Sequence, residues 1–133
     1  MTPSPSPRFS VIGCPFTQTD LPSALSDTVT QALSGEGGYV CFTNVHAAVT
    51  ARTGDGALGK ILANSFMTLP DGKPLFWVGR LKGHADASHI PGPDFFPALL
   101  GMEHNPPLRH YFYGSTPETL AKLQKNIAER YPQ

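Results

Sequence analysis

The sequence predicts an α/β fold in which a mostly parallel sheet is covered by helices on both faces. Segments rich in β-forming residues alternate along the chain with segments of helical periodicity, and this alternation is typical of strand–helix–strand units. The run at residues 39–42 shows no polar alternation, as expected of a strand buried on both faces. Together these observations predict a Rossmann-like sheet with strands near residues 9–14, 39–43, 66–69 and 108–113.

A long helix is predicted between the first two strands. Asp20 is a suitable N-cap for it, and Pro22 suits its first turn. Gly35 begins a glycine-rich stretch that ends the helix, because glycine is favoured just after a helix C-terminus. Its apolar face consists of residues at helical spacing, namely Leu21, Leu25, Val29, Ala32 and Leu33. Two shorter helices follow the second strand, over residues 47–51 and 57–64.

The middle of the chain predicts a tight turn between a strand and a helix. Pro70 stops the strand at residues 66–69, because proline cannot donate a hydrogen bond to a sheet. Asp71 lies in the following turn, where Gly72 supplies conformational freedom. The next helix is predicted over residues 74–82. Its apolar face, with Trp77 expected in the core, consists of Leu75, Phe76, Trp77, Val78 and Leu81.

The last third of the chain predicts a helix, a strand and a final helix. The first of these helices begins with Pro93 or Asp94. The strand at residues 108–113 ends at Gly114. The final helix has apolar residues at Leu120, Leu123, Ile127 and Tyr131. Two arrangements can cap it, Ser115 with Glu118 as a capping box or Thr116 followed by Pro117.

Length and composition exclude several classes of protein. A chain of 133 residues suits one domain, and a formal net charge of +0 gives no reason to expect a nucleic-acid partner. No apolar run reaches the roughly 18 residues of a membrane-spanning helix. Cys14 and Cys41 lie in apolar runs and are predicted to be buried, reduced thiols. Residues 1–8 are predicted to be a disordered Pro/Ser-rich tail, and residues 9–133 a single α/β domain.

Asp71 is the strongest candidate for a functional residue. The carboxyl ends of parallel strands lie on one edge of a sheet, and ligands bind at that edge. A carboxylate held there can act as a general base or orient a ligand. The alternative is a turn residue that bonds only its own backbone. Three predicted strand ends should meet at this edge, Thr43-Asn44, Asp71-Gly72 and Gly114-Ser115.

Several motifs follow one another in a fixed order. Residues 43–46 are Thr-Asn-Val-His, and residues 69–77 are Leu-Pro-Asp-Gly-Lys-Pro-Leu-Phe-Trp. Residues 90–96 are Ile-Pro-Gly-Pro-Asp-Phe-Phe, and residues 113–117 are Tyr-Gly-Ser-Thr-Pro. With the opening strand, this ordered set resembles the WecG/TagA/CpsF glycosyltransferases over nearly everything from Phe9 to Gln133.

The resemblance implies transfer of a sugar from a nucleotide-sugar donor to a polyprenyl-diphosphate-linked glycan acceptor. In the family this reaction serves bacterial surface or exopolysaccharide synthesis at the cytoplasmic, inner face of the plasma membrane. It implies no metal and no cofactor, and it implies Asp71 as the catalytic base. The substrate-binding residues that we expect from it are Thr43, Asn44, His46, Gly72, Gly92, Asp94 and Gly114.

These substrate-binding assignments have structural alternatives. Asn44 and Asp94 also suit helix N-caps. His46 also suits a surface position in the first turn of a helix. The glycines also suit positions where the backbone geometry requires glycine.

The chain departs from the family pattern in three ways. The family has a threonine at the position of Phe42, whereas this chain has Thr43 one place later, and His89 replaces a common arginine. Family members also continue through further strands and helices and a basic, membrane-docking piece. We therefore expect this chain to correspond to the N-terminal portion, to show little transfer alone, and to self-associate or bind a C-terminal half. The alternative function is a truncated, non-catalytic remnant that associates with a partner.

Overall fold

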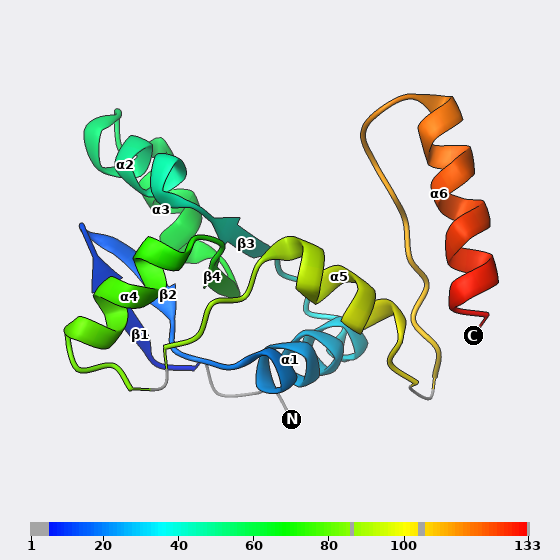
Figure 1. Ribbon diagram of the computed structural model, residues 1–133, viewed down its shortest axis with the longest axis horizontal. Coiled ribbons are helices and arrows are strands. Elements are labelled where there is room, and N and C mark those ends of the chain that lie inside the picture. The colour runs from blue at the N-terminus through cyan, green and yellow to red at the C-terminus, as the bar shows by residue number, and fades with distance from the viewer. Residues whose placement is uncertain (1–5, 86, 104–105, 133) are drawn as a thin grey trace. The chain divides into compact units, whose positions relative to one another are not determined.

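The computed structural model describes residues 6–85, 87–103 and 106–132. The chain forms two compact units, Met1–Phe95 and Phe96–Gln133, and each is described by itself (Figure 1). Most of the predicted tail lies outside the described residues. Its last residue, Arg8, already belongs to a strand. Whether residues 9–133 act as the single domain expected from the sequence stays a prediction.

The first unit begins with a β-hairpin, and the prediction of one strand over residues 9–14 is therefore wrong. Strands β1 (Arg8–Val11) and β2 (Cys14–Thr17) pair antiparallel. The two residues between them, Ile12 and Gly13, have φ values of 48° and 81°. Positive φ at both central residues gives a turn whose twist matches that of the flanking strands. The sequence does not reveal this turn, because Ile12 is a β-forming residue.

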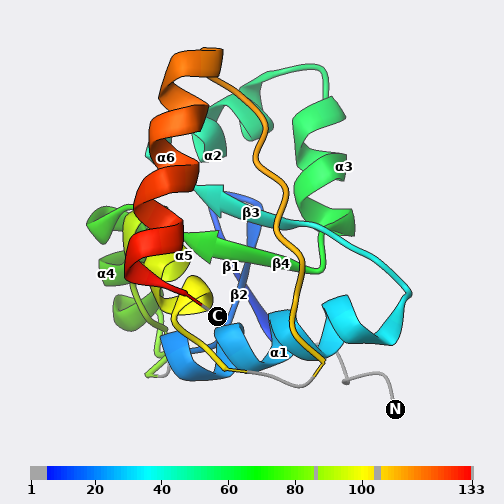
Figure 2. The ribbon, with the colours of Figure 1, turned by 90° about the vertical axis from the view of Figure 1, so that its right-hand side faces the viewer.

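The parallel part of the sheet is confirmed for two strands. Strands β3 (Val40–Thr43) and β4 (Met67–Pro70) run in the same direction, with Val40 opposite Met67 and Thr43 opposite Pro70 (Figure 2). The described residues form two two-stranded sheets rather than one mostly parallel sheet. A hydrogen bond of 3.0 Å from the Thr68 N–H to the Thr17 hydroxyl links the hairpin to β4.

Helix α1 (Leu21–Ser34) confirms the helix predicted before the second strand. The Asp20 side chain accepts a hydrogen bond of 2.8 Å from the Ser23 N–H and caps the helix. Gly35 ends it in the left-handed conformation, with a φ of 78°. The face that packs inward carries Ala24, Leu25 and Val29, whereas Leu33 near the end is exposed.

Helices α2 (Val45–Thr53) and α3 (Ala57–Asn64) connect the two parallel strands. The second matches its predicted bounds, and the first is longer than the sequence predicts. The Arg8 guanidinium donates hydrogen bonds to the carbonyls of Leu62, Ser65 and Phe66, at and just after the end of α3. The Leu62 carbonyl also accepts hydrogen bonds from the Ser65 and Thr68 hydroxyls, so the end of α3 is held by several side chains.

The core of the first unit lies between the hairpin and the helices that pack on it. It consists of Phe9, Val11, Cys14, Phe16, Ala48, Leu62, Leu75 and Ala87. Strand β4 is buried at all four residues, whereas β3 is only partly buried, so the expectation that residues 39–42 are covered on both faces is wrong. Cys14 is buried and Cys41 half-buried, and both are free thiols. Burial raises the pKa of the Cys14 thiol to about 11.

Helix α4 (Lys73–Leu81) forms where predicted, but its orientation differs from the prediction. Leu75 and Gly79 face inward, and the approach at Gly79 is close, since a Cβ there would lie 2.8 Å from Phe9 Cε2. Trp77 and Leu81 are 57% and 87% exposed. The prediction that Trp77 lies in the core is therefore wrong, since a close approach at Gly79, rather than the largest apolar residues, sets the rotation of the helix.

Helix α5 (Gly92–Leu100) crosses the boundary between the two units, and the second unit also contains helix α6 (Pro117–Arg130). The Thr116 hydroxyl accepts a hydrogen bond of 3.3 Å from the Thr119 N–H. The cap of α6 is therefore Thr116, followed by Pro117, rather than Ser115. A Phe96–Phe112 ring contact of 5.7 Å joins α5 to the segment before α6.

The prediction of a strand at residues 108–113 is wrong. These residues form no strand or bridge in the structure. Tyr111 and Tyr113 are 89% and 95% exposed. A strand requires a partner for its N–H and C=O groups, and no described segment pairs with this one. β-forming side chains alone therefore did not make it a strand.

Candidate functional site

The carboxyl ends of β3 and β4 lie side by side, as the sequence predicts. Thr43 and Pro70 are paired residues at the ends of the two strands, so Asn44 and Asp71 begin neighbouring turns. The Asp71 N–H donates a hydrogen bond of 3.0 Å to the Thr43 carbonyl. Gly72 lies beside Val45, because a Cβ built on Gly72 would be 3.9 Å from the Val45 N. The start of α4 and the start of α2 therefore share this edge.

A third segment approaches the same edge from further along the chain. The Ile90 N–H donates a hydrogen bond of 3.0 Å to the Pro70 carbonyl, next to Asp71. Gly92 lies against the Phe42 ring of β3, at 3.9 Å from a Cβ built on it to Phe42 Cγ. The Phe42 and Phe95 rings are also in contact, with centroids 5.2 Å apart. Sequence reasoning missed Ile90, since a backbone hydrogen bond leaves no signal in the identity of a side chain.

Asp71 itself is half-buried. Its carboxylate makes no hydrogen bond with any described residue, and α4 has no side-chain cap. The alternative that Asp71 merely bonds its own turn is therefore not what the structure shows. The conformational freedom of glycine is not needed at position 72, because Gly72 has an extended backbone with a φ of −138°, which any residue can adopt.

The residues after β3 have different environments. Thr43 is buried at 1% exposure, and its carbonyl holds Asp71 in place. The exposed Asn44 caps α2, since its Oδ1 accepts a hydrogen bond of 2.9 Å from the Ala47 N–H. His46 is exposed in the first turn of that helix. A helix cap thus accounts for one side-chain atom of Asn44 and leaves its amide N–H₂ pointing to no described partner.

The last two predicted site residues, Asp94 and Gly114, do not belong to the turns that follow β3 and β4. Asp94 is the third residue of α5 and exposed, so the N-cap alternative for it is wrong and the helix begins earlier than predicted. Gly114 belongs to the second unit and has a φ of 121°, which favours glycine. The expected convergence of Gly114 with Asn44 and Asp71 stays a prediction.

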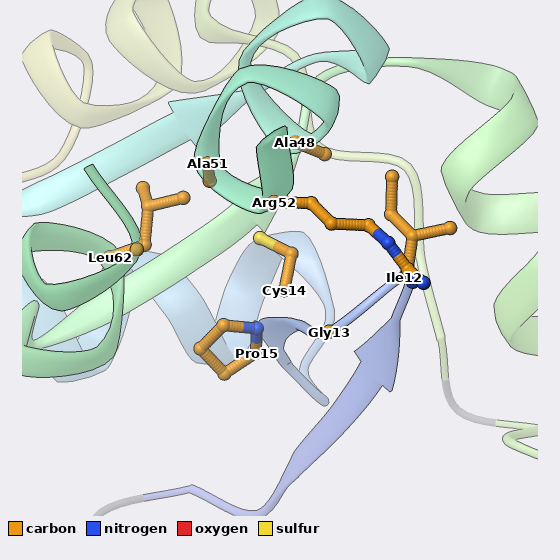
Figure 3. Close-up of a pocket in the computed structure, with 9 residues that line it drawn as sticks. Ile12, Gly13, Cys14, Pro15, Ala48, Ala51, Arg52 and Leu62 are labelled. Atoms are coloured by element: carbon orange, nitrogen blue, oxygen red, sulfur yellow. The ribbon is translucent and has the colours of Figure 1, made fainter. Parts of the chain in front are cut away.

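A separate cavity of about 250 Å³ lies at the hairpin turn, under α2 and α3. Figure 3 shows the Arg52 side chain pointing across it toward Ile12, with Cys14 on its wall. Neither Asn44 nor Asp71 lines it. Within residues 6–85, 87–103 and 106–132, no cluster of His, Cys, Asp or Glu could hold a metal ion. In the same residues, no helix combines the length and apolar character needed to cross a bilayer.

Comparisons with known proteins agree on one family. The model of the Glycosyl transferase WecG/TagA/CpsF family matches residues 9–133. A relative from Bacillus subtilis (strain 168) is named N-acetylglucosaminyldiphosphoundecaprenol N-acetyl-beta-D-mannosaminyltransferase. It is 31% identical over 72 residues, which cover 54% of this chain and 28% of that relative. The match therefore spans less than a third of the relative's length.

Proposed function

The chain belongs to the WecG/TagA/CpsF family of glycosyltransferases, and from this premise we propose that the β3–β4 edge is the acceptor side of a glycosyl-transfer site. The reaction moves a sugar from a nucleotide-sugar to a sugar on a polyprenyl diphosphate. The name of the Bacillus relative gives the first substrates to test. They are an N-acetylmannosamine nucleotide donor and a diphosphoundecaprenol-linked N-acetylglucosamine acceptor, which place the reaction at a membrane surface.

Asp71 serves as the general base in this proposal. The acceptor hydroxyl oxygen attacks the anomeric carbon of the donor and forms the new glycosidic bond. The bond between that carbon and the diphosphate oxygen breaks, and the nucleoside diphosphate leaves with the electron pair. The hydroxyl proton passes to the Asp71 carboxylate, because a positioned carboxylate can accept it in the transition state.

The observation that carries the proposal is the environment of Asp71. Its backbone is fixed by the hydrogen bond to Thr43, and the preceding residue is fixed by Ile90. Its carboxylate nevertheless makes no hydrogen bond with the described residues. A polar group that is held in place yet has no structural partner is available to a substrate.

The neighbouring residues have supporting roles. Asn44 begins the turn beside Asp71, and its amide N–H₂, which has no partner among the described residues, is suited to an acceptor hydroxyl or a donor oxygen. His46 and Gly72 flank it from α2 and the α4 turn. Thr43 acts through its backbone, since its side chain is buried. Gly92 supplies close backbone approach beside Phe42, and Asp94 and Gly114 are proposed as further substrate contacts.

The test replaces Asp71 and measures transfer under single-turnover conditions, where slow reactions are detectable. Asp71→Asn keeps the side chain nearly isosteric but removes the base. We expect it to lower the rate of transfer by roughly 10²-fold or more. An unchanged rate would return Asp71 to the role of a turn residue.

Asp55→Asn is the matched control. Asp55 lies in another turn of the first unit, where it is exposed, and its Oδ1 accepts a hydrogen bond of 2.9 Å from the Ala57 N–H. Asparagine keeps that acceptor, so both stability and transfer should stay at the level of the unmodified chain. An equal loss in both variants would point to general damage rather than to a base at Asp71.

A further inference from the structure

We propose that the outward face of α4 is a docking surface for an anionic phospholipid bilayer. We define this surface, the α4 face, by Trp77, Val78 and Leu81 with Lys73 and Lys82 at its two ends. Trp77 and Leu81 are 57% and 87% exposed, and Val78 is also exposed. Three exposed apolar side chains on a helix of nine residues form a patch of the kind that marks an interaction site.

The exposure of this face is built into the packing of the first unit. Gly79 and Leu75 are buried one helical turn apart and set which side of α4 faces inward. A Cβ on Gly79 would lie 2.8 Å from Phe9 Cε2 and 3.2 Å from the Ala87 Cβ. If the helix were rotated to bury Trp77, the indole would have to enter the narrow space beside Phe9 and Ala87, where Gly79 now lies without a side chain.

The charges around the α4 face favour an anionic partner. The helix and its C-cap carry Lys73, Arg80 and Lys82 and no acidic residue. Lys73 is exposed and makes no ion pair or hydrogen bond with the described residues. The Lys82 ammonium donates to the Ser10 carbonyl at 2.9 Å, and the Arg80 guanidinium lies 5.0 Å from the Phe76 ring centre. Tryptophan and leucine flanked by cations suit the boundary between lipid headgroups and acyl chains.

The size of the α4 face argues against a second copy of this chain as its occupant. Nine residues of helix are about 14 Å long, and a stable protein interface buries about 800 Å² on each partner. One face of so short a helix cannot supply that area. Shallow insertion into a bilayer requires only a few apolar side chains and attraction to acidic headgroups.

Docking through α4 would also position the candidate site, a consequence that rests on the proposed function. The helix begins immediately after Asp71 and Gly72. With α4 lying in the bilayer surface, the Asp71 turn would be close to the plane where a lipid-linked diphosphate leaves the membrane. Val45, which is exposed beside Gly72, extends the apolar surface toward Asn44.

The chain contains a single tryptophan, so Trp77 fluorescence reports on this surface directly. The experiment adds vesicles of phosphatidylglycerol mixed with phosphatidylcholine to the full chain. We expect a blue shift and quenching by lipids brominated on their acyl chains. Vesicles of phosphatidylcholine alone should bind less, and added salt should weaken binding because it screens the attraction of cations to headgroups.

Variants distinguish vesicle binding through the α4 face from non-specific binding of the chain to vesicles. Leu81→Gln should weaken partitioning into vesicles about tenfold, as expected for the loss of one buried leucine, and Lys73→Gln should reduce the preference for anionic vesicles. The matched control is Ile61→Gln, because Ile61 is 50% exposed on α3 of the same unit. It should bind vesicles like the unmodified chain. Circular dichroism verifies that each variant folds.

Three results would overturn the proposal: no fluorescence change with anionic vesicles, equal losses in Leu81→Gln and Ile61→Gln, or a blue shift that rises with protein concentration without vesicles. The last would identify a second copy as the occupant. Vesicle binding is measured without donor or acceptor, so the two proposals fail separately. Unchanged transfer by Asp71→Asn would overturn only the proposed function, and absent vesicle binding would overturn only the docking surface.

Discussion

Two segments of the chain have similar β-forming sequences and different structures. Residues 67–70 form β4, and every residue of that strand is buried. Residues 108–113 are richer in aromatic side chains but form no strand, and two of their tyrosines are almost fully exposed. The two segments differ because β4 has hydrogen-bonding neighbours, whereas no described segment pairs with residues 108–113. β4 pairs with β3. Its Thr68 N–H donates a hydrogen bond to the Thr17 hydroxyl, and its Pro70 carbonyl accepts one from the Ile90 N–H.

This comparison shows that strand propensity is not sufficient to make a strand. A β-strand is stabilised by a pairing partner and by packing on at least one face. By contrast, the helix caps at Asp20, Asn44 and Thr116 join residues only three positions apart and need no partner distant in the sequence. Substitutions that act through tertiary packing should therefore have larger effects than substitutions that act locally.

The largest difference is expected between equivalent truncations in the two segments. Leu69 is fully buried in β4, so Leu69→Ala should lower the free energy of unfolding by about 2–5 kcal/mol. Tyr113 is 95% exposed, so Tyr113→Ala should change it by less than about 0.5 kcal/mol. Urea unfolding measures both. A large loss for Tyr113→Ala would show that residues 108–113 are buried in solution and would break the comparison.

A second effect should appear at two glycines at and near the ends of α4. Gly79→Ala places a methyl group 2.8 Å from Phe9 and should destabilise the chain by about 1–3 kcal/mol through overpacking. Gly72→Ala is the matched control for stability, since its Cβ would have no contact closer than 3.8 Å and its φ suits any residue. Thermal unfolding of both variants distinguishes tight packing from a general intolerance of alanine in this helix.

A smaller, local effect is expected at Asn44. Asn44→Ala removes the cap of α2 and should cost about 1 kcal/mol, whereas Asn44→Ser keeps a capping oxygen and should cost little. The pair also separates the two roles of this residue. If the amide binds substrate, Asn44→Ser should raise KM while stability stays normal. Normal stability together with normal KM in Asn44→Ser would leave Asn44 as a cap alone.

The smallest effect concerns pH and the cap of α1. The Ser23 backbone N–H bonds the Asp20 carboxylate and lowers the pKa of that carboxyl below its usual value. Its contribution to stability is therefore present above the unfolded-state pKa near 4 and lost as the pH falls through the folded-state value. Asp20→Asn keeps a good cap and should flatten this part of the stability profile between about pH 5 and 2. An unchanged profile would show that other groups cause the acid sensitivity.

The sequence predicted where the turns of the candidate site lie in the chain, because the relevant signals are local. Pro70 and Asp71 marked the end of a strand and the start of a turn, and Asn44 marked a helix start. Since β3 and β4 are parallel, these two turns had to share an edge. The place of Gly114 depended on a fourth strand, and that strand did not form. The contribution of Ile90 depended on a backbone contact that its side chain does not encode.

The sequence by itself determined where the helices lie, the caps at Asp20 and Asn44, and the glycine after α1, because each follows from bonds between residues a few positions apart. It also determined which residues follow β3 and β4. Only the tertiary structure decided that residues 8–17 fold into a hairpin and that residues 108–113 remain unpaired. It also decided how closely α4 approaches the hairpin, since a Cβ at position 79 would lie 2.8 Å from the Phe9 ring, which is distant in sequence. With Leu75 and Gly79 packed inward, Trp77 and Leu81 lie on the opposite, exposed side of the helix, because a helix buries only the face that contacts its neighbours.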